Sequence, residues 1–349
     1  MKKVKRLHVA GFTCFEDTQF EFNDHINVII GKNGTGKTHV LKILAATLSS
    51  FELLTKSSTN AKDKFENILA EQLIAFFKPE QLGRLVKRQP GRAAAKINIT
   101  IDKSELSFGF ATNSKSSVKI EKNPELVPLS FLYIPPREMF SLYEGFLSLH
   151  EKREISFDET YVRLAKALDA PLLKGKRYDE VAKLIKPLED ELRASVVKEN
   201  GRFYLKDAGG KMEAHLVAEG LRKLASIMYL ILNGELTKNS ILFWDEPESN
   251  LNPKLITVVA TFLSLLADNG VQVFISTHDY LLTHHLSLIA EYQTSKKGKM
   301  KFFSISKDND DNTTMEAGDL LSAIDNNPIL DEFAAYYDLE QSYFSKSLE

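Results

Sequence analysis

Three short, mostly apolar runs stand out along the chain, and each ends in polar residues. They lie at residues 26–30, 241–244 and 271–276. Continuous apolar runs of this length are typical of strands that are buried on both faces, as in a parallel sheet covered by helices. Ligands of such sheets bind at the carboxyl ends of the strands, so we expect the polar residues after these runs to form one site.

Two other patterns divide the rest of the chain. Between residues 95 and 121, apolar and polar positions alternate, which predicts a small antiparallel sheet. Residues 137–194 predict a helical insertion, and residues 308–349 predict a C-terminal helical extension. Residues 1–136 and 195–307 are then the two halves of one α/β core.

Composition changes this picture little. The chain has 349 residues, 43% hydrophobic and 26% charged, with a formal net charge of −2. These values are ordinary for a globular protein and leave any contact with nucleic acid to a local patch. Cys14 is the single cysteine, so no disulfide can form within the chain. Because no apolar run reaches membrane-spanning length either, we expect a soluble protein of the cytoplasm.

The first apolar run leads into a phosphate-binding loop. Gly31, Gly36, Lys37 and Thr38 match the pattern G-x-x-x-x-G-K-[ST], and an amphipathic helix follows. In such a loop backbone N–H groups surround phosphate, the lysine reaches the β- and γ-phosphates, and the threonine hydroxyl ligates Mg²⁺. We therefore expect ATP and Mg²⁺ as cofactors. The expected nucleotide-binding residues are Gly31, Lys32, Asn33, Gly34, Thr35, Gly36, Lys37 and Thr38.

The second apolar run ends in an acidic pair, Asp245 and Glu246. Beside a phosphate loop, Asp245 would hold Mg²⁺ through water. Glu246 would act on the water that attacks the γ-phosphate, as a general base or by orienting it. The alternative is an acidic turn that opens the next helix, with Pro253 in its first turn.

The third run is followed by His278. It would lie beside the acidic pair and contact the γ-phosphate, so we assign it a catalytic role together with Glu246; a purely structural histidine is the alternative. A further apolar helix begins near Gly220, about 25 residues before Asp245. A glycine at a helix start leaves backbone N–H groups open to an anion, although a loop glycine without function is the simpler interpretation.

Together these motifs resemble the ABC-type ATPases of the SMC, RecF and OLD kind. The resemblance rests on the phosphate loop, on FWDEPESNLNP at residues 243–253 and on STHD at residues 276–279. It implies an α/β P-loop NTPase fold with an ABC-type ATPase core. It also implies a head-to-tail dimer, in which Gly220 of one subunit caps the ATP held by the other and Asn250 lies in a loop that meets the opposite subunit.

The chain departs from this family in places. Ala218 and Glu219 stand where the family commonly has serine, and Glu138 stands near the position of its Mg²⁺-sensing glutamine. A carboxylate can also ligate Mg²⁺ or orient its water, so Glu138 is a candidate metal residue; a Pro-Pro turn with charged surface residues is the alternative. Phe12 or Phe15 could stack on adenine or pack in the core, and we carry Phe15 as the cofactor-binding candidate.

One basic cluster lies in a stretch without acidic residues, from Gln81 to Ile101. It consists of Arg84, Lys87, Arg88, Arg92 and Lys96. The cluster could bind the phosphates of DNA or RNA, or form a solvated or partner-facing surface.

These observations lead us to expect an ATP-hydrolysing switch. It would dimerise around ATP and control a separate effector protein, as the ATPase component of a bacterial anti-phage defence system. The alternative is a RecF-like DNA-repair ATPase that binds DNA directly through the basic cluster.

Overall fold

The centre of the molecule is a six-stranded sheet. The computed structural model describes residues 2–56, 62–123, 129–308 and 312–347. The sheet has the order β14-β13-β3-β12-β11-β7, and its neighbouring strands are parallel except for the β13–β14 pair. Its strands are β3 (Ile26–Gly31), β7 (Phe131–Ile134), β11 (Ile241–Asp245), β12 (Gln272–Thr277), β13 (Met300–Lys307) and β14 (Thr313–Gly318). The three apolar runs of the sequence are thus three adjacent strands: β3, β12 and β11.

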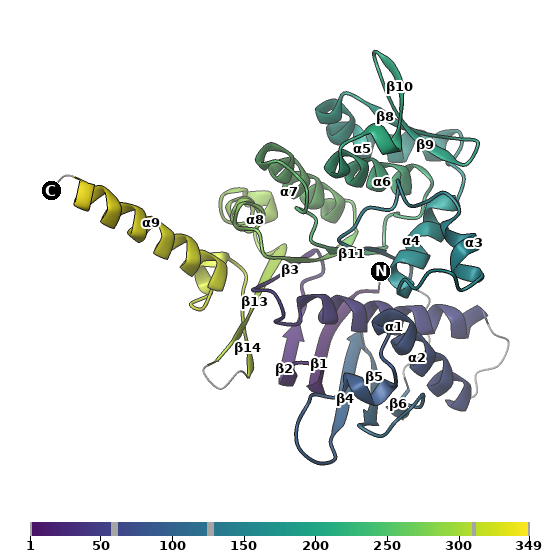
Figure 1. The fold of residues 1–349 in the computed structure, drawn as a ribbon, viewed down its shortest axis with the longest axis vertical. Coiled ribbons are helices and arrows are strands. Elements are labelled where there is room, and N and C mark those ends of the chain that lie inside the picture. Colours follow the sequence, from purple (N-terminus) through teal and green to yellow (C-terminus); the bar gives the residue numbers. More distant parts are fainter. Residues whose placement is uncertain (1, 57–61, 124–128, 309–311, 348–349) are drawn as a thin grey trace.

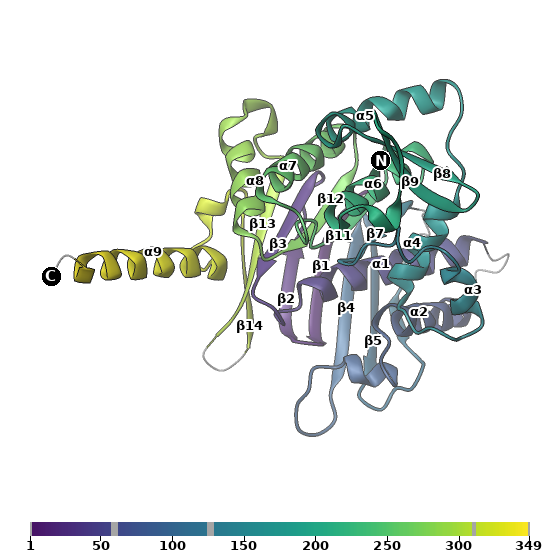
Figure 2. The same cartoon turned by 45° about the horizontal axis from the view of Figure 1, so that its top comes forward.

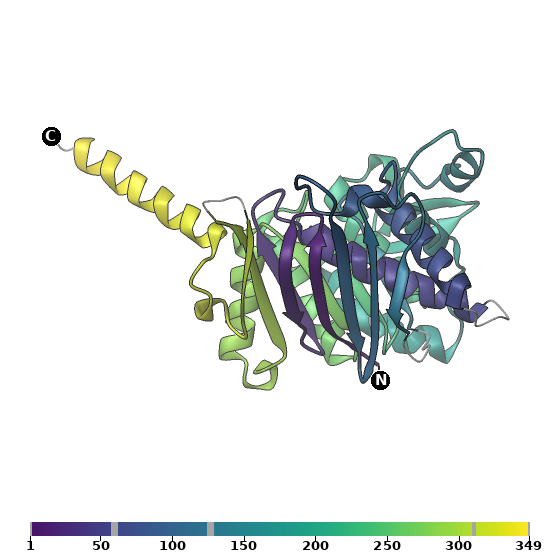
Figure 3. The same cartoon turned by 90° about the horizontal axis from the view of Figure 1, so that it is seen from below.

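A five-stranded antiparallel sheet faces the first one, in the order β2-β1-β4-β5-β6. It stands in front in Figure 3. Its strands are β1 (Val4–Phe12), β2 (Phe15–Glu21), β4 (Ala94–Ile101), β5 (Ser104–Ala111) and β6 (Lys119–Lys122). The antiparallel sheet predicted between residues 95 and 121 is therefore larger than expected, because β1 and β2 extend it.

Helices cover both faces of the parallel sheet. Helices α1 (Lys37–Lys56) and α2 (Lys62–Phe77) pack between it and the antiparallel sheet. The other face carries α4 (Glu159–Asp169), α5 (Lys176–Leu192), α6 (Glu219–Leu232), α7 (Pro253–Asp268) and α8 (Tyr280–Tyr292). Figures 1 and 2 show this layer on the upper side of the parallel strands.

Each central strand contributes to two hydrophobic cores. In β3, Val28 and Ile30 belong to the core under α4–α8, whereas Ile29 belongs to the core shared with the antiparallel sheet. In β12, Phe274 belongs to the core shared with the antiparallel sheet, whereas Val273 and Ile275 belong to the core under α4–α8. Successive side chains of a strand point to opposite faces, so a continuous apolar run is needed where both faces are buried.

A buried glutamine joins the two sheets. The Gln272 side chain accepts a hydrogen bond from the Val4 backbone N–H at 2.9 Å and donates one to the Val4 carbonyl oxygen at 2.8 Å. It also donates to the Asn23 carbonyl oxygen at 2.9 Å. The amide satisfies backbone groups that would otherwise be buried without partners, and it fixes the first strand of the chain to β12.

The remaining segments contain further helices and a small sheet. Residues 137–194 contain α3 (Phe146–Glu151), α4 and α5, and a small sheet of β8 (Ser195–Glu199), β9 (Arg202–Asp207) and β10 (Gly210–Glu213) follows. The segment 308–349, predicted as helical, includes strand β14 before helix α9 (Pro328–Ser347) begins. Helix α9 extends away from the body in all three views (Figures 1–3). Among the described residues, none of the helices has the length and apolar character to cross a membrane.

Candidate nucleotide-binding site

The phosphate loop connects β3 to α1 and is closed by its own lysine. Lys37 Nζ donates hydrogen bonds to the carbonyl oxygens of Gly31 at 2.7 Å and Lys32 at 3.0 Å. The side chain is largely covered, and burial lowers its pKa, while the carboxylates of the acidic strand end oppose this shift. The ammonium group thus lies inside the curve of the loop, where a triphosphate would bind.

The loop rests on an aromatic side chain. Gly36 has φ +96°, and a Cβ there would lie 2.4 Å from Cys14 Sγ and 2.8 Å from Phe15 Cζ. Phe15 itself is 1% exposed and packs edge-on against Phe20. This placement agrees with the core-packing alternative for Phe15, because the ring is covered on the side that adenine would need.

Thr38 and Asp245 meet at the carboxyl end of the central strands. The Thr38 hydroxyl donates to Asp245 Oδ1 at 3.1 Å, and the Ser276 hydroxyl donates to the same oxygen. Tyr133 OH donates to Asp245 Oδ2 at 3.4 Å. Burial raises the pKa of Asp245, and the hydrogen bonds from Ser276 and Thr38 act against that shift.

This pair fits a magnesium ion. A hydroxyl after the phosphate loop and a carboxylate at the end of β11 converge here, and both are hard oxygen donors, which Mg²⁺ prefers. Thr38 would bind the ion directly and Asp245 through water. Glu138, the third candidate, has other partners: its carboxylate accepts from Ser141 and forms an ion pair with Arg222 Nε at 2.9 Å.

The acidic turn places Glu246 against His278. Glu246 has φ +49°, and its Oε1 lies 3.3 Å from His278 Nδ1. Glu248 lies behind them: its Oε1 accepts from the Thr277 hydroxyl at 2.7 Å. Its Oε2 has no hydrogen-bond partner among the described residues, and burial raises its pKa. The histidine is therefore held between two carboxylates, one of them half-open to solvent.

The comparisons with known proteins agree with this geometry. The model of the AAA_21 family, described as "AAA domain, putative AbiEii toxin, Type IV TA system", matches residues 26–283, about three quarters of the chain. The chain belongs to the AAA_21 family. Within the aligned region lie the phosphate loop, the acidic turn and His278.

This AAA_21 protein is also similar to curated proteins over a short stretch of its sequence. It is 39% identical over 59 residues to the DNA replication and repair protein RecF of Chloroherpeton thalassium, and 31% identical over 62 residues to RecF of Lactococcus lactis subsp. cremoris. These alignments cover 17% and 18% of the chain and only 16% of each relative.

An SMC head bound to the C-terminal winged-helix domain of ScpA has the same fold, with 14% identity and a TM-score of 0.53 over 92% of this chain and 98% of that one. A second similar structure is an SMC head with an extended coiled coil, bound to the ScpA C-terminal domain derived from Pyrococcus furiosus. It is 13% identical to this chain, with a TM-score of 0.53 over 96% of this chain and 100% of that one. The predicted ABC-type ATPase of the SMC and RecF kind, with its P-loop fold, is confirmed.

The glycine in the first turn of α6 has a packing role within this AAA_21 protein. A Cβ on Gly220 would lie 2.3 Å from the Asn250 carbonyl oxygen and 2.8 Å from Leu251 Cδ2. The start of α6 is therefore pressed against the loop after the acidic turn. Ala218, at the N-cap, makes no side-chain capping bond, and both Ala218 and Glu219 are exposed.

A buried lysine ties α6 to the acidic turn. Lys223 Nζ donates to the Glu246 carbonyl oxygen and to Ser249 Oγ, the latter at 2.7 Å. Burial lowers the pKa of Lys223 to about 8, against the attraction of Glu248 and other acids nearby. Among the described residues, Glu219 forms no ion pair with Lys223 or with Arg222, whose Nε pairs with Glu138.

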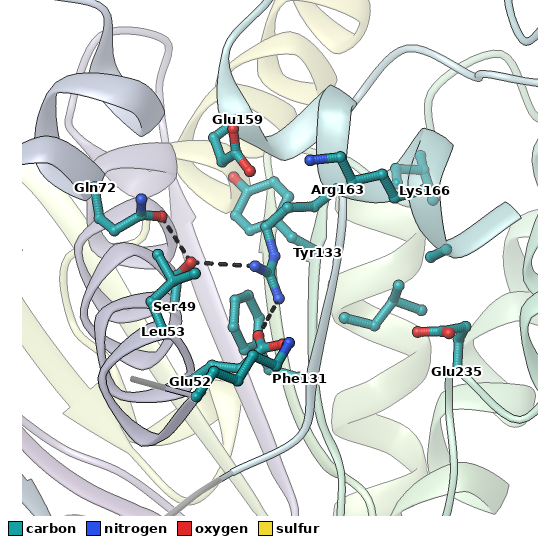
Figure 4. Close-up of a pocket in the computed structure, with 14 residues that line it drawn as sticks. Ser49, Glu52, Leu53, Gln72, Phe131, Tyr133, Glu159, Arg163, Lys166 and Glu235 are labelled. Atoms are coloured by element: carbon teal, nitrogen blue, oxygen red, sulfur yellow. Dashed lines mark hydrogen bonds and ion pairs between the residues drawn. The ribbon is translucent and has the colours of Figure 1, made fainter. Parts of the chain in front are cut away.

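The insertion is anchored to the phosphate-loop helix. Lys42 of α1 forms a 2.6 Å ion pair with Asp158, the N-cap of α4, and both side chains are less than a fifth exposed. One turn further, Arg163 of α4 reaches Glu52 at 2.6 Å and Ser49 at 3.1 Å beside a pocket of about 470 Å³ (Figure 4). No residue of the phosphate loop lines the pocket, but its lining includes Tyr133, whose hydroxyl donates to Asp245.

In the folded chain, acidic side chains pair with three of the five cations of the basic cluster. Arg84 pairs with Glu80, Lys87 with Glu16, and Lys96 with Glu121. Arg88 and Arg92 are exposed, and no ion pair involves them among the described residues. Two arginines, rather than five cations, therefore remain for a phosphate backbone.

Sequence reasoning did not assign roles to three residues of the site. Glu248 was visible in the motif, but its contact with Thr277 depends on strand register. Tyr133 lies inside a short apolar strand, where an aromatic residue signals only the core. Lys223 is one of several charged residues at the start of a helix, and nothing in its spacing indicates that it reaches Glu246.

Proposed function

We propose that the chain is an ATP-hydrolysing switch that closes as a head-to-tail dimer around ATP and so controls a separate effector protein. The observation that carries the proposal is the convergence of Lys37, Thr38, Asp245, Glu246 and His278 at one edge of the parallel sheet. Family membership supports nucleotide binding but leaves the reaction and the effector as proposals.

Hydrolysis would use the residues in the positions described. Lys37 would exchange its carbonyl partners for phosphate oxygens, and Thr38 and Asp245 would hold Mg²⁺, which would neutralise charge on the phosphates when bound. Glu246 would orient the attacking water and accept its proton, and the adjacent His278 would hold the Glu246 carboxylate in place and donate toward the γ-phosphate.

Two variants test the assignment. Glu246→Gln should retain ATP binding and lower turnover at least about 100-fold, because it removes a group needed in the transition state. Lys37→Ala should weaken ATP binding itself. Glu291→Gln, on an exposed position of α8, is the matched control. Near wild-type turnover by Glu246→Gln would remove the catalytic role proposed for this residue.

The start of α6 supports the head-to-tail arrangement. Its N-terminal N–H groups lack a side-chain cap, and Leu216 beside it is 72% exposed, as is fitting for a surface that a partner covers. Because Gly220 is needed for packing within the chain, a bulky group at Ala218 is the cleaner probe. Ala218→Arg should bind ATP yet fail to hydrolyse it.

Mixing Ala218→Arg with Lys37→Ala tests the composite site. Each variant alone would form dimers with two defective sites. A mixed dimer would combine the intact loop of one chain with the intact α6 of the other, so equal amounts should recover about a quarter of wild-type activity. If the two variants form mixed dimers but stay inactive after mixing, the head-to-tail arrangement is contradicted.

The effector and the defence role are supported by the family description, which names an AbiEii toxin of a type IV toxin–antitoxin system. Phage plaque counts on cells with the complete gene neighbourhood should rise to the unprotected level with Glu246→Gln. Protection that is independent of Glu246 would contradict a role for ATP turnover.

The second candidate is a RecF-like ATPase that binds DNA directly. It is supported by the RecF alignments and by the exposed Arg88 and Arg92. DNA binding that weakens with salt, and that weakens further in the Arg88→Ala/Arg92→Ala double variant than in a control at Arg84, would favour this candidate.

A further inference from the structure

Helix α9 carries a stripe of uncovered aromatic residues. Of its side chains described here, only Pro328 is buried. Its exposed aromatic residues are Phe333 (54%), Tyr336 (71%), Tyr337 (60%), Tyr343 (63%) and Phe344 (61%). At 3.6 residues per turn these five positions lie on one side of the helix. Isolated exposed apolar residues are ordinary, but a continuous stripe marks an interaction surface.

A single acid lies within this stripe. Glu340 falls on the aromatic side of α9, whereas Asp331 and Asp338 fall on the opposite side. A surface that covers the aromatic residues must therefore also accept a carboxylate, and a buried carboxylate without a cation is costly. The occupant must combine apolar side chains with a positive charge.

Apolar residues lie on the outer side of α8, which also carries the exposed acid Glu291, and a positive charge follows in the segment after the helix. Leu288 is 39% exposed and Tyr292 is 71% exposed, one turn apart on α8. Beyond them, Lys297 is exposed, and the described residues give it no ion-pair partner, whereas Lys296 and Lys299 are held by Asp268. The stripe of α9 and the length of α8 are both roughly 16–18 Å at 1.5 Å per residue.

Within one chain, α9 contacts α8 through an aromatic pair near the start of both helices. Phe333 stacks on Tyr280, the first residue of α8 in the same chain, with ring centroids 4.5 Å apart. From there α9 points away from the body (Figures 1 and 3), so the residues beyond Phe333 do not reach their own α8.

We propose that α9 of one copy lies on the outer side of α8 of a second copy, and that the second copy returns the same contact. The reciprocal arrangement is that of a two-fold dimer. With roughly 200 Å² for each aromatic residue, the exposed fractions leave about 600 Å² on each stripe. Two contacts would cover about 1,200 Å² of α9 surface, before the area covered on α8 is added, and so together reach the size of a specific interface.

Pairing of the two α9 helices with each other is less suitable. Glu340 lies near the middle of the stripe, so parallel and antiparallel packing both bring the two Glu340 carboxylates close together without a cation between them. Like charges that approach in a desolvated contact oppose association. The α8 surface supplies Lys297 instead.

The experiment is sedimentation velocity of the full chain without nucleotide. It is carried out in a Lys37→Ala background, so that this contact is measured apart from the proposed ATP-dependent closure. We expect a dimer whose dissociation constant rises at least tenfold with Glu340→Lys and with Tyr292→Ser. Asp338→Lys adds the same charge on the opposite side of α9 and should leave it unchanged. Circular dichroism of each variant checks that the fold is intact.

The decisive test exchanges the charges of Lys297 and Glu340. Lys297→Glu should weaken the dimer, and combined with Glu340→Lys it should restore the dissociation constant to within about threefold of the starting value. A monomeric chain at tens of micromolar would overturn the inference, since the stripe would then belong to another protein. Equal loss from Asp338→Lys and Glu340→Lys, or a double variant no tighter than the single ones, would overturn it too.

Discussion

Replacing Lys223 with methionine tests whether the buried ammonium group holds the catalytic turn. Lys223 is 2% exposed and donates to the carbonyl oxygen of Glu246, whose φ is +49°. A left-handed residue other than glycine costs about 1–2 kcal/mol, and a hydrogen bond from a charged donor contributes about 1.5–3 kcal/mol, enough to offset it. Loss of that bond during catalysis corresponds to a fall in kcat of roughly 10- to 100-fold.

The same variant should remain folded near neutral pH. Burial lowers the pKa of Lys223 from 10.5 to about 8, which corresponds to a cost of about 3 kcal/mol for the buried charge. Methionine removes this cost but also removes the hydrogen bonds of the ammonium group. The two changes in the free energy of unfolding nearly cancel. Between pH 8 and 10.5 the unfolded wild-type chain binds a proton that the folded chain lacks. Its free energy of unfolding should therefore rise with pH relative to the variant, by at most about 3 kcal/mol.

Two measurements check this reasoning. Steady-state ATPase activity at saturating ATP gives kcat for wild type, Lys223→Met and a control, Lys183→Met, at an exposed position of α5. Urea unfolding at pH 7.5 and pH 10 gives the change in stability with pH. A kcat for Lys223→Met within twofold of wild type, in a protein that unfolds with the same urea dependence, would refute the positioning role.

Three further predictions concern the loop and its supports. Gly36→Ala should weaken binding of a fluorescent ATP analogue more than tenfold, because φ is +96° and the new methyl group would collide with Cys14. Phe15→Ala should lower the free energy of unfolding by about 3–5 kcal/mol in urea, as a fully buried ring does; a loss confined to ATP affinity would instead favour adenine stacking. Lys42→Ala should destabilise by about 1–3 kcal/mol because it leaves Asp158 partly buried and unpaired, and the Lys42→Ala/Asp158→Ala double variant should recover part of this in a double-mutant cycle.

The sequence predicted the parts of the fold that local patterns determine. The apolar runs at β3, β11 and β12 are continuous because both faces of these strands are buried, and that pattern is readable without neighbours. The phosphate loop is local as well. The extent of the antiparallel sheet was not predictable from local patterns, because β1 pairs with β4, about 90 residues away in the chain.

The roles of charged residues were harder to predict than the strands. Two cations of the basic cluster meet acids that lie far from them in the chain, as Lys87 meets Glu16 and Lys96 meets Glu121. Glu138 resembles a metal residue by position, yet the fold places Arg222 beside it. Such pairings depend on which side chains tertiary contacts bring together, and a single sequence does not contain that information.

Strand β3 has a consequence for how the protein is made. The strand that holds the phosphate loop pairs with β12 and β13 and with no strand near it in the chain. Strand β12 begins about 240 residues after the loop. At roughly 5–20 residues per second, a ribosome needs roughly 12–50 s to supply it. During synthesis the loop therefore lacks the framework that shapes it, and the nascent chain acquires a nucleotide site only after β12 and β13 have been made.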